Sequence, residues 1–532
     1  MKHYSADLVV IGGGSTGVGI ARDAAMRGLS VVLVDKGDLG SGTTGRFHGQ
    51  LHSGGRYVVS DMESAIECAR ENHTLRHIHS DAIEDCGGMF TLLSGDNPAY
   101  ADQWIQKSQE IGLPFQEISC KEAFRREPRL SPTLARAALV EEGSIDSWKM
   151  VWGAVHSAQA YGATVLRYHQ VTDMVVTDGT INTVICHDLR HDEQANISCA
   201  YVANAAGPWA GKIAALAQCF DVDVVCGRGV MVAMNHRLVN TVINRWVWPG
   251  DGGTLVPAHS VCIIGTTDVV DDDPDHLAIP RVEVEQMLDS GEELIPGFRK
   301  ARALRAWAGA RPLLHDKRVA DDDTRHMSRG MSIIDHEDRD GIQNFVSIIG
   351  GKLSTYRLMA EKVTDILAKK ANNHALCRTA SEPVPEARAG SYYALTSRFK
   401  QREIEGKRSS SHSSDEDSLD NQIICECELV TRKMILDALS EDPEASFDDL
   451  RRRLRVGMGP CQGGFCSQRI AGLSVENGFC NAAEATARLR DFLARRWKGV
   501  MPVAHGQQAR EMALDSWIHD NTLDIPDLLK NQ

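Results

Sequence analysis

Apolar positions near the start of the chain form two short continuous runs with a helical pattern between them. Residues 8–11 are apolar, a glycine-rich turn follows, residues 18–27 have a helical pattern, and residues 31–34 are apolar again. Continuous apolar runs of this length are typical of strands that are buried on both faces of a parallel sheet. Gly28 stands where a helix commonly ends. The pattern predicts a strand, a helix and a second strand of a Rossmann-like unit.

The turn between the first strand and the helix has the spacing of a dinucleotide-binding turn. Gly12, Gly14 and Gly17 form a G-x-G-x-x-G pattern. The first glycine allows the tight turn, the second lets the backbone approach a pyrophosphate, and the third lets the helix pack closely on the strand. Asp35 ends the second strand, where a carboxylate can accept hydrogen bonds from a ribose. The predicted cofactor contacts of this unit are Gly12, Gly13, Gly14, Ser15, Thr16, Gly17, Asp35 and Lys36.

The position of this unit at the start of the chain bears on the choice of cofactor. Flavoproteins often open on such a unit, so its start at residue 7 favours FAD over NAD. A glycine-rich turn of some other α/β protein is the alternative. The nucleotide is favoured because strand, turn, helix, second strand and acidic end all follow in the order that the motif requires.

Three later turns are further candidates for contacts with the cofactor. The small-residue loop of residues 41–49 can lie against a flat ring, although an ordinary connection has the same composition. Residues 202–209 are a strand that breaks into a small-residue turn. Residues 345–357 place a glycine turn before a helix, where an anion or a flavin carbonyl can bind. The predicted contacts in these turns are Ser41, Thr43, Thr44, Gly45, Ala206, Gly207, Gly351, Lys352, Leu353 and Ser354.

Length, charge and the distribution of apolar residues narrow the class of protein. The chain has 532 residues, 42% of them apolar, which is enough for several domains with sizeable cores. Its net charge of −14 argues against nucleic acid as a partner, and an anionic small substrate would need a local basic pocket. No signal peptide is visible, and no apolar run approaches the roughly 18 residues of a spanning helix. We expect a reduced, cytoplasmic setting with only indirect membrane contact.

Four cysteines near the end of the chain form a second candidate site. Cys425 and Cys427 are spaced C-x-C, and Cys461 and Cys466 follow at C-x4-C spacing after 33 intervening residues. Four thiolates from two short loops can hold a [2Fe-2S] cluster. Structural zinc is an alternative, although it usually prefers C-x2-C knuckles. The same four residues could also form a disulfide pair or bind no metal.

The chain resembles the FAD-bearing A subunits of bacterial anaerobic glycerol-3-phosphate dehydrogenases over nearly its whole length. The resemblance rests on the four terminal cysteines and on residues 11–17, 52–57, 204–209, 264–268, 309–313, 350–357 and 495–500. It implies FAD bound in a glutathione-reductase-like and amino-acid-oxidase-like α/β fold, and a terminal domain like the bacterioferritin-associated ferredoxin. It also implies two partners: an iron–sulfur membrane-anchor subunit, which delivers electrons to quinone, and a second flavoprotein subunit. The expected location is the cytoplasmic face of the inner membrane, as a peripheral protein.

The predicted domain organisation combines these signals. Residues 1–378 are expected to form the FAD-dependent oxidoreductase domain, with an antiparallel-sheet substrate domain inserted at roughly 216–324, since residues 224–307 alternate like an antiparallel sheet. The polar residues 379–420 are expected to form a linker. Residues 421–482 would form a small helical [2Fe-2S] domain, and residues 483–532 a C-terminal tail.

The resemblance also implies a substrate, sn-glycerol 3-phosphate, and residues that surround it. Arginines that match Arg56 and Arg311, and a lysine that matches Lys352, surround the substrate of related single-chain enzymes, and the two arginines would grip its phosphate. A salt bridge from Arg311 to the acidic run 321–323 is the alternative. Those enzymes carry a histidine as a proposed base where this chain has Met231, so the base is open between His52, Lys352 and an ordered water.

Three different functions compete with this one. The chain could be an FAD-dependent oxidase of another small hydroxy- or amino-substrate, but such an enzyme needs no cysteine quartet and no arginine pair. It could be an electron-transfer subunit without catalytic activity. The terminal domain could also be a zinc-binding docking module, which metal analysis would reveal.

Overall fold

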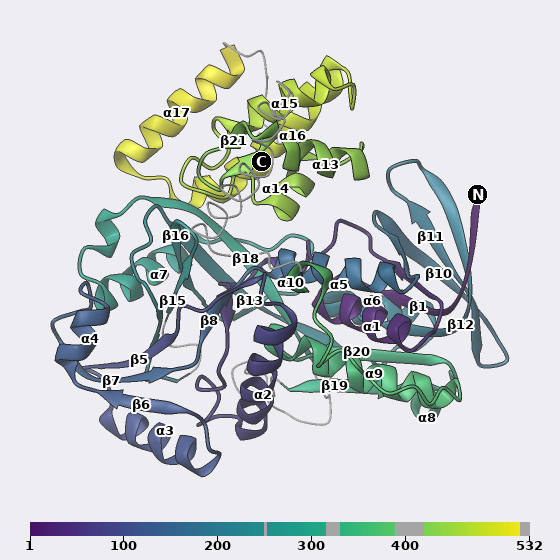
Figure 1. The fold of residues 1–532 in the computed structure, drawn as a ribbon, viewed down its shortest axis with the longest axis horizontal. Helices are drawn as coiled ribbons and strands as arrows, with labels where there is room; N and C mark the ends of the chain where they lie inside the picture. Colours follow the sequence, from purple (N-terminus) through teal and green to yellow (C-terminus); the bar gives the residue numbers. More distant parts are fainter. Residues whose placement is uncertain (249–252, 315–329, 389–419, 522–532) are drawn as a thin grey trace, which may run out of the picture.

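The computed structural model of the chain describes residues 1–248, 253–314, 330–388 and 420–521, and two β-sheets organise its larger part (Figure 1). The first sheet has the order β10-β11-β12-β1-β2-β9, with β20 beside β12 and β19 beside β20. β1 is parallel to both of its neighbours, β12 and β2. The strands of this sheet are β1 (Lys2–Ile11), β2 (Val31–Val34), β9 (Thr164–Leu166), β10 (His169–Thr177), β11 (Thr180–Asp188), β12 (Glu193–Asn204), β19 (Met331–Asp335) and β20 (Phe345–Gly350).

Both faces of this sheet are buried, as its apolar runs predict. Leu8 and Val10 belong to a core shared with α1 (Ser15–Met26), α5 (Ser147–Ala160) and α9 (Tyr356–Lys370). Val9 and Ile11 point the other way, into a core shared with α6 (Ala210–Leu216). The predicted Rossmann-like unit is confirmed. Its helix begins three residues before the expected start, because small residues of the glycine pattern already form the first helical turn.

The second sheet has the order β17-β13-β16-β15-β14-β5-β7-β6, and β18 pairs with β13. Its strands are β5 (Gly88–Leu93), β6 (Phe115–Ile118), β7 (Leu134–Val140), β13 (Val224–Met234), β14 (Val242–Arg245), β15 (Thr254–Ala258), β16 (Val261–Gly265), β17 (Val269–Val270) and β18 (Ala303–Leu314). β13, β15, β16 and β18 pair antiparallel, as their alternation predicts. The sheet extends beyond the expected insert of 216–324, because β14 pairs in parallel with β5.

The remaining elements before residue 389 connect or cover the two sheets. α7 packs on β13 and β16, and α2 lies beside the turn that precedes α9. These elements are α2 (Met62–Ile78), α3 (Pro98–Glu110), α4 (Cys120–Arg126), α7 (Arg281–Leu294), α8 (His336–Asp340), α10 (Pro385–Arg388), β3 (Gln50–Leu51), β4 (Ile83–Glu84) and β8 (Gly143–Ile145). Most of the expected linker, residues 389–419, lies outside the described residues, as does the acidic run 321–323.

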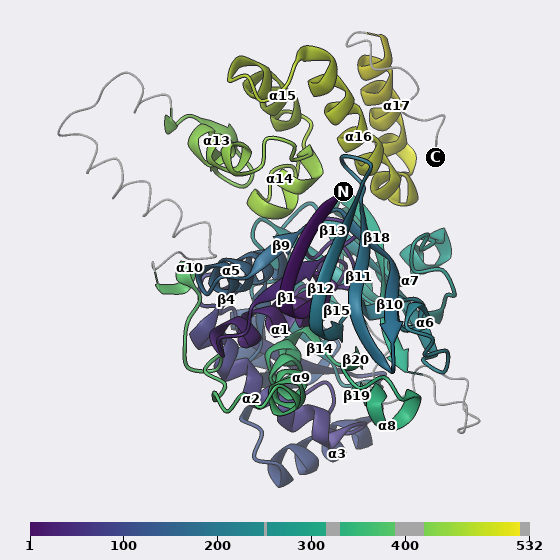
Figure 2. The ribbon, with the colours of Figure 1, turned by 90° about the vertical axis from the view of Figure 1, so that its right-hand side faces the viewer.

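The C-terminal helices form a separate layer on top of the two-sheet body (Figure 2). The elements of this layer are β21 (Ile423–Cys425), β22 (Val430–Thr431), α13 (Arg432–Glu441), α14 (Phe447–Leu454), α15 (Cys466–Glu476), α16 (Ala482–Val500) and α17 (Gly506–Asn521). One apolar core contains Phe447 and Ile470 together with Phe492, Trp497 and Met512. Residues of the expected tail therefore share a core with the residues around the cysteines. We call residues 420–521 the cluster domain.

None of the helices in residues 1–248, 253–314, 330–388 and 420–521 is both long enough and apolar enough to cross a bilayer.

Candidate active site and metal centre

A cavity of about 860 Å³ lies between the two sheets and gathers most of the predicted cofactor and substrate residues. Predicted residues in its wall are Gly12, Gly14, Ser15, Thr16, Asp35, Lys36, Ser41, Thr43, Thr44, His52, Arg56, Ala206, Gly207, Arg311, Gly351, Lys352 and Leu353. Four predicted cofactor residues are not part of this wall: Gly13, Gly17, Gly45 and Ser354. Residues far apart in the sequence thus meet in one space that is wide enough for a dinucleotide.

The glycine turn has little room for side chains, which is what a backbone cradle for phosphates requires. A Cβ atom on Gly17 would lie 1.8 Å from the carbonyl oxygen of Gly12, and a Cβ on Gly12 would lie 2.5 Å from that of Ala205. Gly12 also has a φ of +112°, which only glycine adopts readily. α1 begins at Ser15 without a side-chain cap, so the N-terminal end of the helix is open to an anion at the cavity wall.

Asp35 lies at the end of β2 and is held in place by the backbone. Its carboxylate accepts hydrogen bonds from the backbone N–H of Gly13 at 2.6 Å and of Gly37 at 2.7 Å. Burial raises the pKa of Asp35 to about 6, against the stabilising effect of these two donors. Lys36, the adjacent predicted contact, reaches instead to Asp275 at 2.6 Å and lies over the Trp209 ring. Asp35 and Lys36 both line the cavity, and the fixed carboxylate of Asp35 suits a ribose.

The two arginines expected at the substrate lie in the cavity wall with His52 and Lys352. Arg311 donates to Asp268 at 3.1 Å and to the Thr266 hydroxyl at 2.5 Å. The Asp268 side chain is only 3% exposed, so it is a fixed anchor for the guanidinium. The alternative anchor, the acidic run 321–323, lies outside the described residues.

Lys352 and His52 lie against the same aromatic ring. The Lys352 ammonium donates to the Ser64 hydroxyl at 2.7 Å and lies 4.5 Å from the centre of the Tyr57 ring. The His52 ring lies 5.3 Å from the same ring, and its backbone N–H donates to Ser354. Met231 is buried against Gly265, where a Cβ would lie 2.6 Å from the Met231 side chain. Met231 therefore places a thioether, which cannot act as a base, in this part of the cavity wall.

Two titratable residues near the arginines were not predicted from the sequence. His48 lines the cavity, and burial together with the charges of Arg56 and Arg311 lowers its pKa to about 3. Glu142 is fully buried behind this wall, and burial raises its pKa to about 7. The sequence does contain a signal for His48, because it stands only four residues before the predicted site residue His52. Glu142 gave no signal, because its partners Gln50, Ser53 and Asn244 are distant in sequence.

The four cysteines converge in the cluster domain. β21 ends at Cys425, α15 begins at Cys466, and Cys427 and Cys461 lie in the adjacent turns. The proximity of Cys466 lowers the pKa of Cys461 to about 5, and the proximity of Cys425 and Cys461 raises the pKa of Cys466. A Cβ on Gly459 would lie 2.2 Å from the Cβ of Cys427, so this loop can close only with glycine.

The donor set of the cluster domain fits a [2Fe-2S] cluster, because four thiolates reach one place from two short loops. Zinc would take the same four thiolates in a tetrahedral arrangement, with Zn–S bonds of ≈ 2.3 Å. Among the described residues, a separate group of metal-ligating side chains is Cys219, His336 and Asp340, whose ligand atoms all lie within 4.8 Å of one another.

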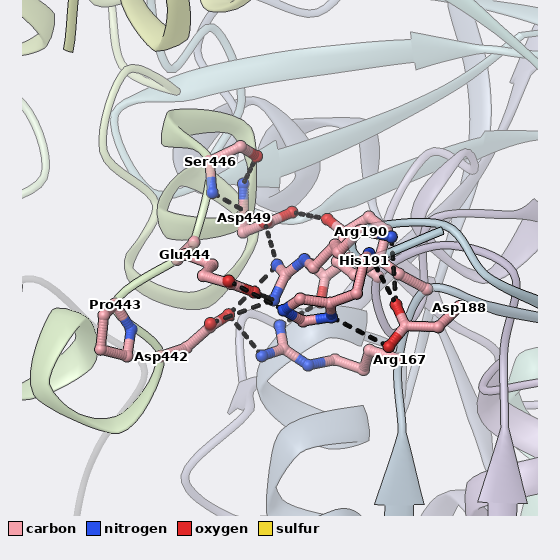
Figure 3. Close-up of polar contacts among 12 residues, drawn as sticks. Arg167, Asp188, Arg190, His191, Asp442, Pro443, Glu444, Ser446 and Asp449 are labelled. Carbon is pink, nitrogen blue, oxygen red and sulfur yellow. Dashed lines mark hydrogen bonds and ion pairs between the residues drawn. The ribbon is translucent and has the colours of Figure 1, made fainter. Parts of the chain in front are cut away.

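Charged residues attach the cluster domain to the two-sheet body. Figure 3 shows Arg167 and Arg190 reaching Asp442, while Arg190 also reaches Asp449. His191 and Glu444 extend this contact at 3.1 Å. Arg167 and Arg190 lie in turns of the first sheet, so the contact holds the cluster domain against the sheet that carries the dinucleotide-binding turn.

A second, buried contact involves the residue that follows Cys427. Glu428 accepts from Arg455 at 2.9 Å and lies 3.2 Å from His259 in the turn between β15 and β16. Arg455 also donates to Asp146, the cap of α5, at 3.0 Å. The loop that carries two of the cysteines is therefore tied to both sheets of the body.

Comparison with known proteins decides between the families that could build such a site. Residues 7–350 match the family model described as FAD dependent oxidoreductase, and residues 423–473 match that of the BFD-like [2Fe-2S] binding domain. The A subunit of anaerobic glycerol-3-phosphate dehydrogenase from Haemophilus influenzae is 37% identical over 99% of this chain and 95% of its own length. The chain belongs to the family of anaerobic glycerol-3-phosphate dehydrogenase A subunits.

Further members and solved structures agree with this assignment. The A1 subunit of the enzyme from Haloferax volcanii is 39% identical over 98% of this chain and 91% of its own length. The structure of glycerol-3-phosphate dehydrogenase from Bacillus halodurans, complexed with FAD, aligns with a TM-score of 0.68 at 19% identity, over 94% of this chain and 96% of that one. At this identity the likeness concerns the fold. The predicted family, fold class and two cofactors are confirmed.

Proposed function

We propose that this protein oxidises sn-glycerol 3-phosphate to dihydroxyacetone phosphate and passes the electrons through its cluster domain to partner subunits. The observation that carries the proposal is the cavity in which the dinucleotide-binding turn meets Arg56 and Arg311. Two guanidinium groups in one cavity suit a phosphate ester, and they supply the local positive charge that a chain of net charge −14 needs for an anionic substrate.

The arginines would fix the substrate by its phosphate. Asp268 and Thr266 hold the plane of the Arg311 guanidinium, so little side-chain freedom is lost when the phosphate binds. The three-carbon chain would then extend from the arginines into the cavity that the turn at Gly351 also lines. FAD held by the glycine turn would supply the acceptor for the hydride of C2, and a cluster held by the four cysteines would supply the path for the electrons.

A base must take the proton of the C2 hydroxyl. We favour His52 for this role over Lys352, because the ammonium of Lys352 donates to Ser64 and lies over the Tyr57 ring as a cation. General-base help of this kind is typically worth about 10²- to 10⁴-fold in rate. Lys352 would instead place positive charge beside the reduced cofactor.

The partners follow from the family. Its members are named as A subunits, which implies an enzyme of several different chains. We propose two partners: an iron–sulfur membrane-anchor subunit, with quinone as the final acceptor, and a second flavoprotein subunit. The chain would then be a peripheral protein on the cytoplasmic face of the inner membrane, where it contacts the membrane only through these partners.

An absorption spectrum of the pure protein, with iron and zinc counted, tests the proposal. We expect a flavin spectrum, about two irons per chain, and bleaching by sn-glycerol 3-phosphate but not by glycerol. A yellow protein that the substrate leaves unbleached would identify an electron-transfer subunit. Bleaching by another hydroxy- or amino-compound alone would identify a different oxidase, and zinc in place of iron would identify a docking module.

A further inference from the structure

His48 lines the same cavity as Arg56 and Arg311, and the charges of both arginines act on its imidazole. It lies in the small-residue loop of residues 41–49, just before β3, and its ring centre lies 5.8 Å from that of His52. A Cβ on Gly265 would contact both His48, at 3.5 Å, and Met231. His48 is therefore an imidazole that lies close to Met231 in the cavity wall.

The hydrogen bond at its Nδ1 determines which nitrogen of His48 carries the proton. The backbone N–H of Gln50 donates to Nδ1 at 3.2 Å, so the lone pair of that nitrogen is occupied. In a neutral imidazole the hydrogen is then on Nε2. No hydrogen bond joins Nε2 to another of the described residues, and the side chain lines the cavity. Nε2–H is therefore a donor available to a ligand.

Burial and the two neighbouring guanidinium groups keep this imidazole neutral. They lower the pKa of His48 to about 3, so protonation does not occur at physiological pH. A neutral imidazole whose Nδ1 is already bonded offers one donor and no accessible lone pair. His48 can thus bind an anion without adding a third positive charge to the pair of arginines, and it cannot replace the base missing at Met231.

We propose that His48 is a substrate-recognition residue whose Nε2–H donates a hydrogen bond to a phosphate oxygen held by Arg56 and Arg311. The inference rests on the proposed function, because it assumes that the arginines hold the phosphate. Two arginines leave several phosphate lone pairs open, and a neutral donor of fixed direction adds selectivity for a tetrahedral phosphate over a planar carboxylate.

The test compares variants that keep or remove a donor. In the holoenzyme, His48→Gln retains an N–H donor at a similar distance from the backbone, while His48→Phe retains a ring without a donor. We expect His48→Phe to weaken the binding of inorganic phosphate and to raise KM for sn-glycerol 3-phosphate by about tenfold or more, with kcat changed less than about threefold. We expect the phosphate affinity, KM and kcat of His48→Gln each to stay within about threefold of the wild-type values. His77→Gln and His77→Phe on the exposed side of α2 serve as controls.

The outcomes separate this inference from the proposed function. Equal phosphate binding by wild type and His48→Phe overturns the inference, and so does an equal loss in both His48 variants, since one keeps the donor. A collapse of kcat with a changed pH profile would make His48 a base and also overturns it. If His48→Phe does not retain flavin, His48→Met provides the donor-free comparison. A wild type that binds phosphate but is not bleached by the substrate contradicts the proposed function and leaves the phosphate comparison valid.

Discussion

Arg452 of the cluster domain donates to Asp38 at 2.6 Å, three residues beyond the carboxylate that ends β2. Asp38 also accepts from Arg167 at 2.9 Å, and Arg452 reaches Asp448 and Asp449 on its own helix. Both partners of the Arg452–Asp38 pair are buried. The contact therefore connects the domain that carries the four cysteines with the loop that follows the dinucleotide-binding unit.

Replacing Arg452 should loosen this connection. Arg452→Met removes the positive charge that Asp38, Asp448 and Asp449 share, and all three carboxylates are buried. Removing one partner of a buried ion pair typically costs about 3–5 kcal/mol. We expect the free energy of unfolding to fall by about this amount in chemical denaturation. Arg490→Met on α16 serves as the control, because Arg490 is exposed and its pair with Asp491 spans 3.9 Å. Equal stability of the two variants would contradict the role of the contact.

The affinity for FAD should depend on pH through Asp35. Its pKa in the folded chain without cofactor is raised to about 6 by burial, above its ordinary value of 3.8. A ribose donates to the ionised carboxylate, so binding releases a proton from any chain in which Asp35 is protonated. The affinity should therefore rise with pH between about 4 and 6, by up to about tenfold per unit, and become constant above about pH 7. Titration of the apoprotein with FAD measures this.

A substitution of Asp35 isolates its part of the pH dependence. Asp35→Asn still accepts hydrogen bonds but does not ionise, so its affinity for FAD should be weaker and should not rise between about pH 4 and 6. Asp7→Asn, at an exposed carboxylate that bonds to Ser30, should retain the slope of the wild type. A slope that persists in Asp35→Asn would assign the dependence to another group.

Local patterns allowed part of this site to be predicted from the sequence. The glycine turn, Asp35 and the two cysteine pairs are recognisable from short spacings in the sequence. Each of these spacings is set by one physical requirement. Lys36 shows what such patterns leave open. It lines the cavity beside Asp35, but the bond of its ammonium to Asp275, 239 positions away, could not be predicted from local spacing.

Long-range pairing accounts for what the sequence did not reveal. The second sheet includes β5 because Val242 to Arg245 pair in parallel with Gly88 to Thr91, and no periodicity within either strand indicates its partner. Asp268 as the anchor of Arg311 follows from the pairing of β13 with β17 and β18. α16 has a clear amphipathic pattern, but only the packing shows that its apolar face completes the core around the cysteines.

Removing one cysteine of the quartet should remove iron and leave the flavin. In Cys461→Ser we expect iron to fall from about two atoms per chain to nearly none, because a weaker ligand remains at one of four positions. Bleaching of the flavin by sn-glycerol 3-phosphate should persist, since the cavity does not include Cys461. Cys480→Ser, at a cysteine outside the quartet, should retain iron. Full iron in Cys461→Ser would disprove the assignment of the ligands.

The binding of the substrate phosphate should depend on Arg311. Arg311→Ala removes a charged donor and leaves Asp268 buried without it, so we expect KM for sn-glycerol 3-phosphate to rise by about 10- to 150-fold, from the ~1.5–3 kcal/mol of a hydrogen bond to a charged group. Arg311→Lys keeps the charge but cannot reach Thr266, Asp268 and the phosphate together, and its KM should lie between those of the wild type and Arg311→Ala. The flavin content of each variant, measured first, controls for folding. An unchanged KM in Arg311→Ala would rule out the arginine pair as the phosphate site, whereas an equal loss in Arg311→Lys would show that geometry outweighs charge there.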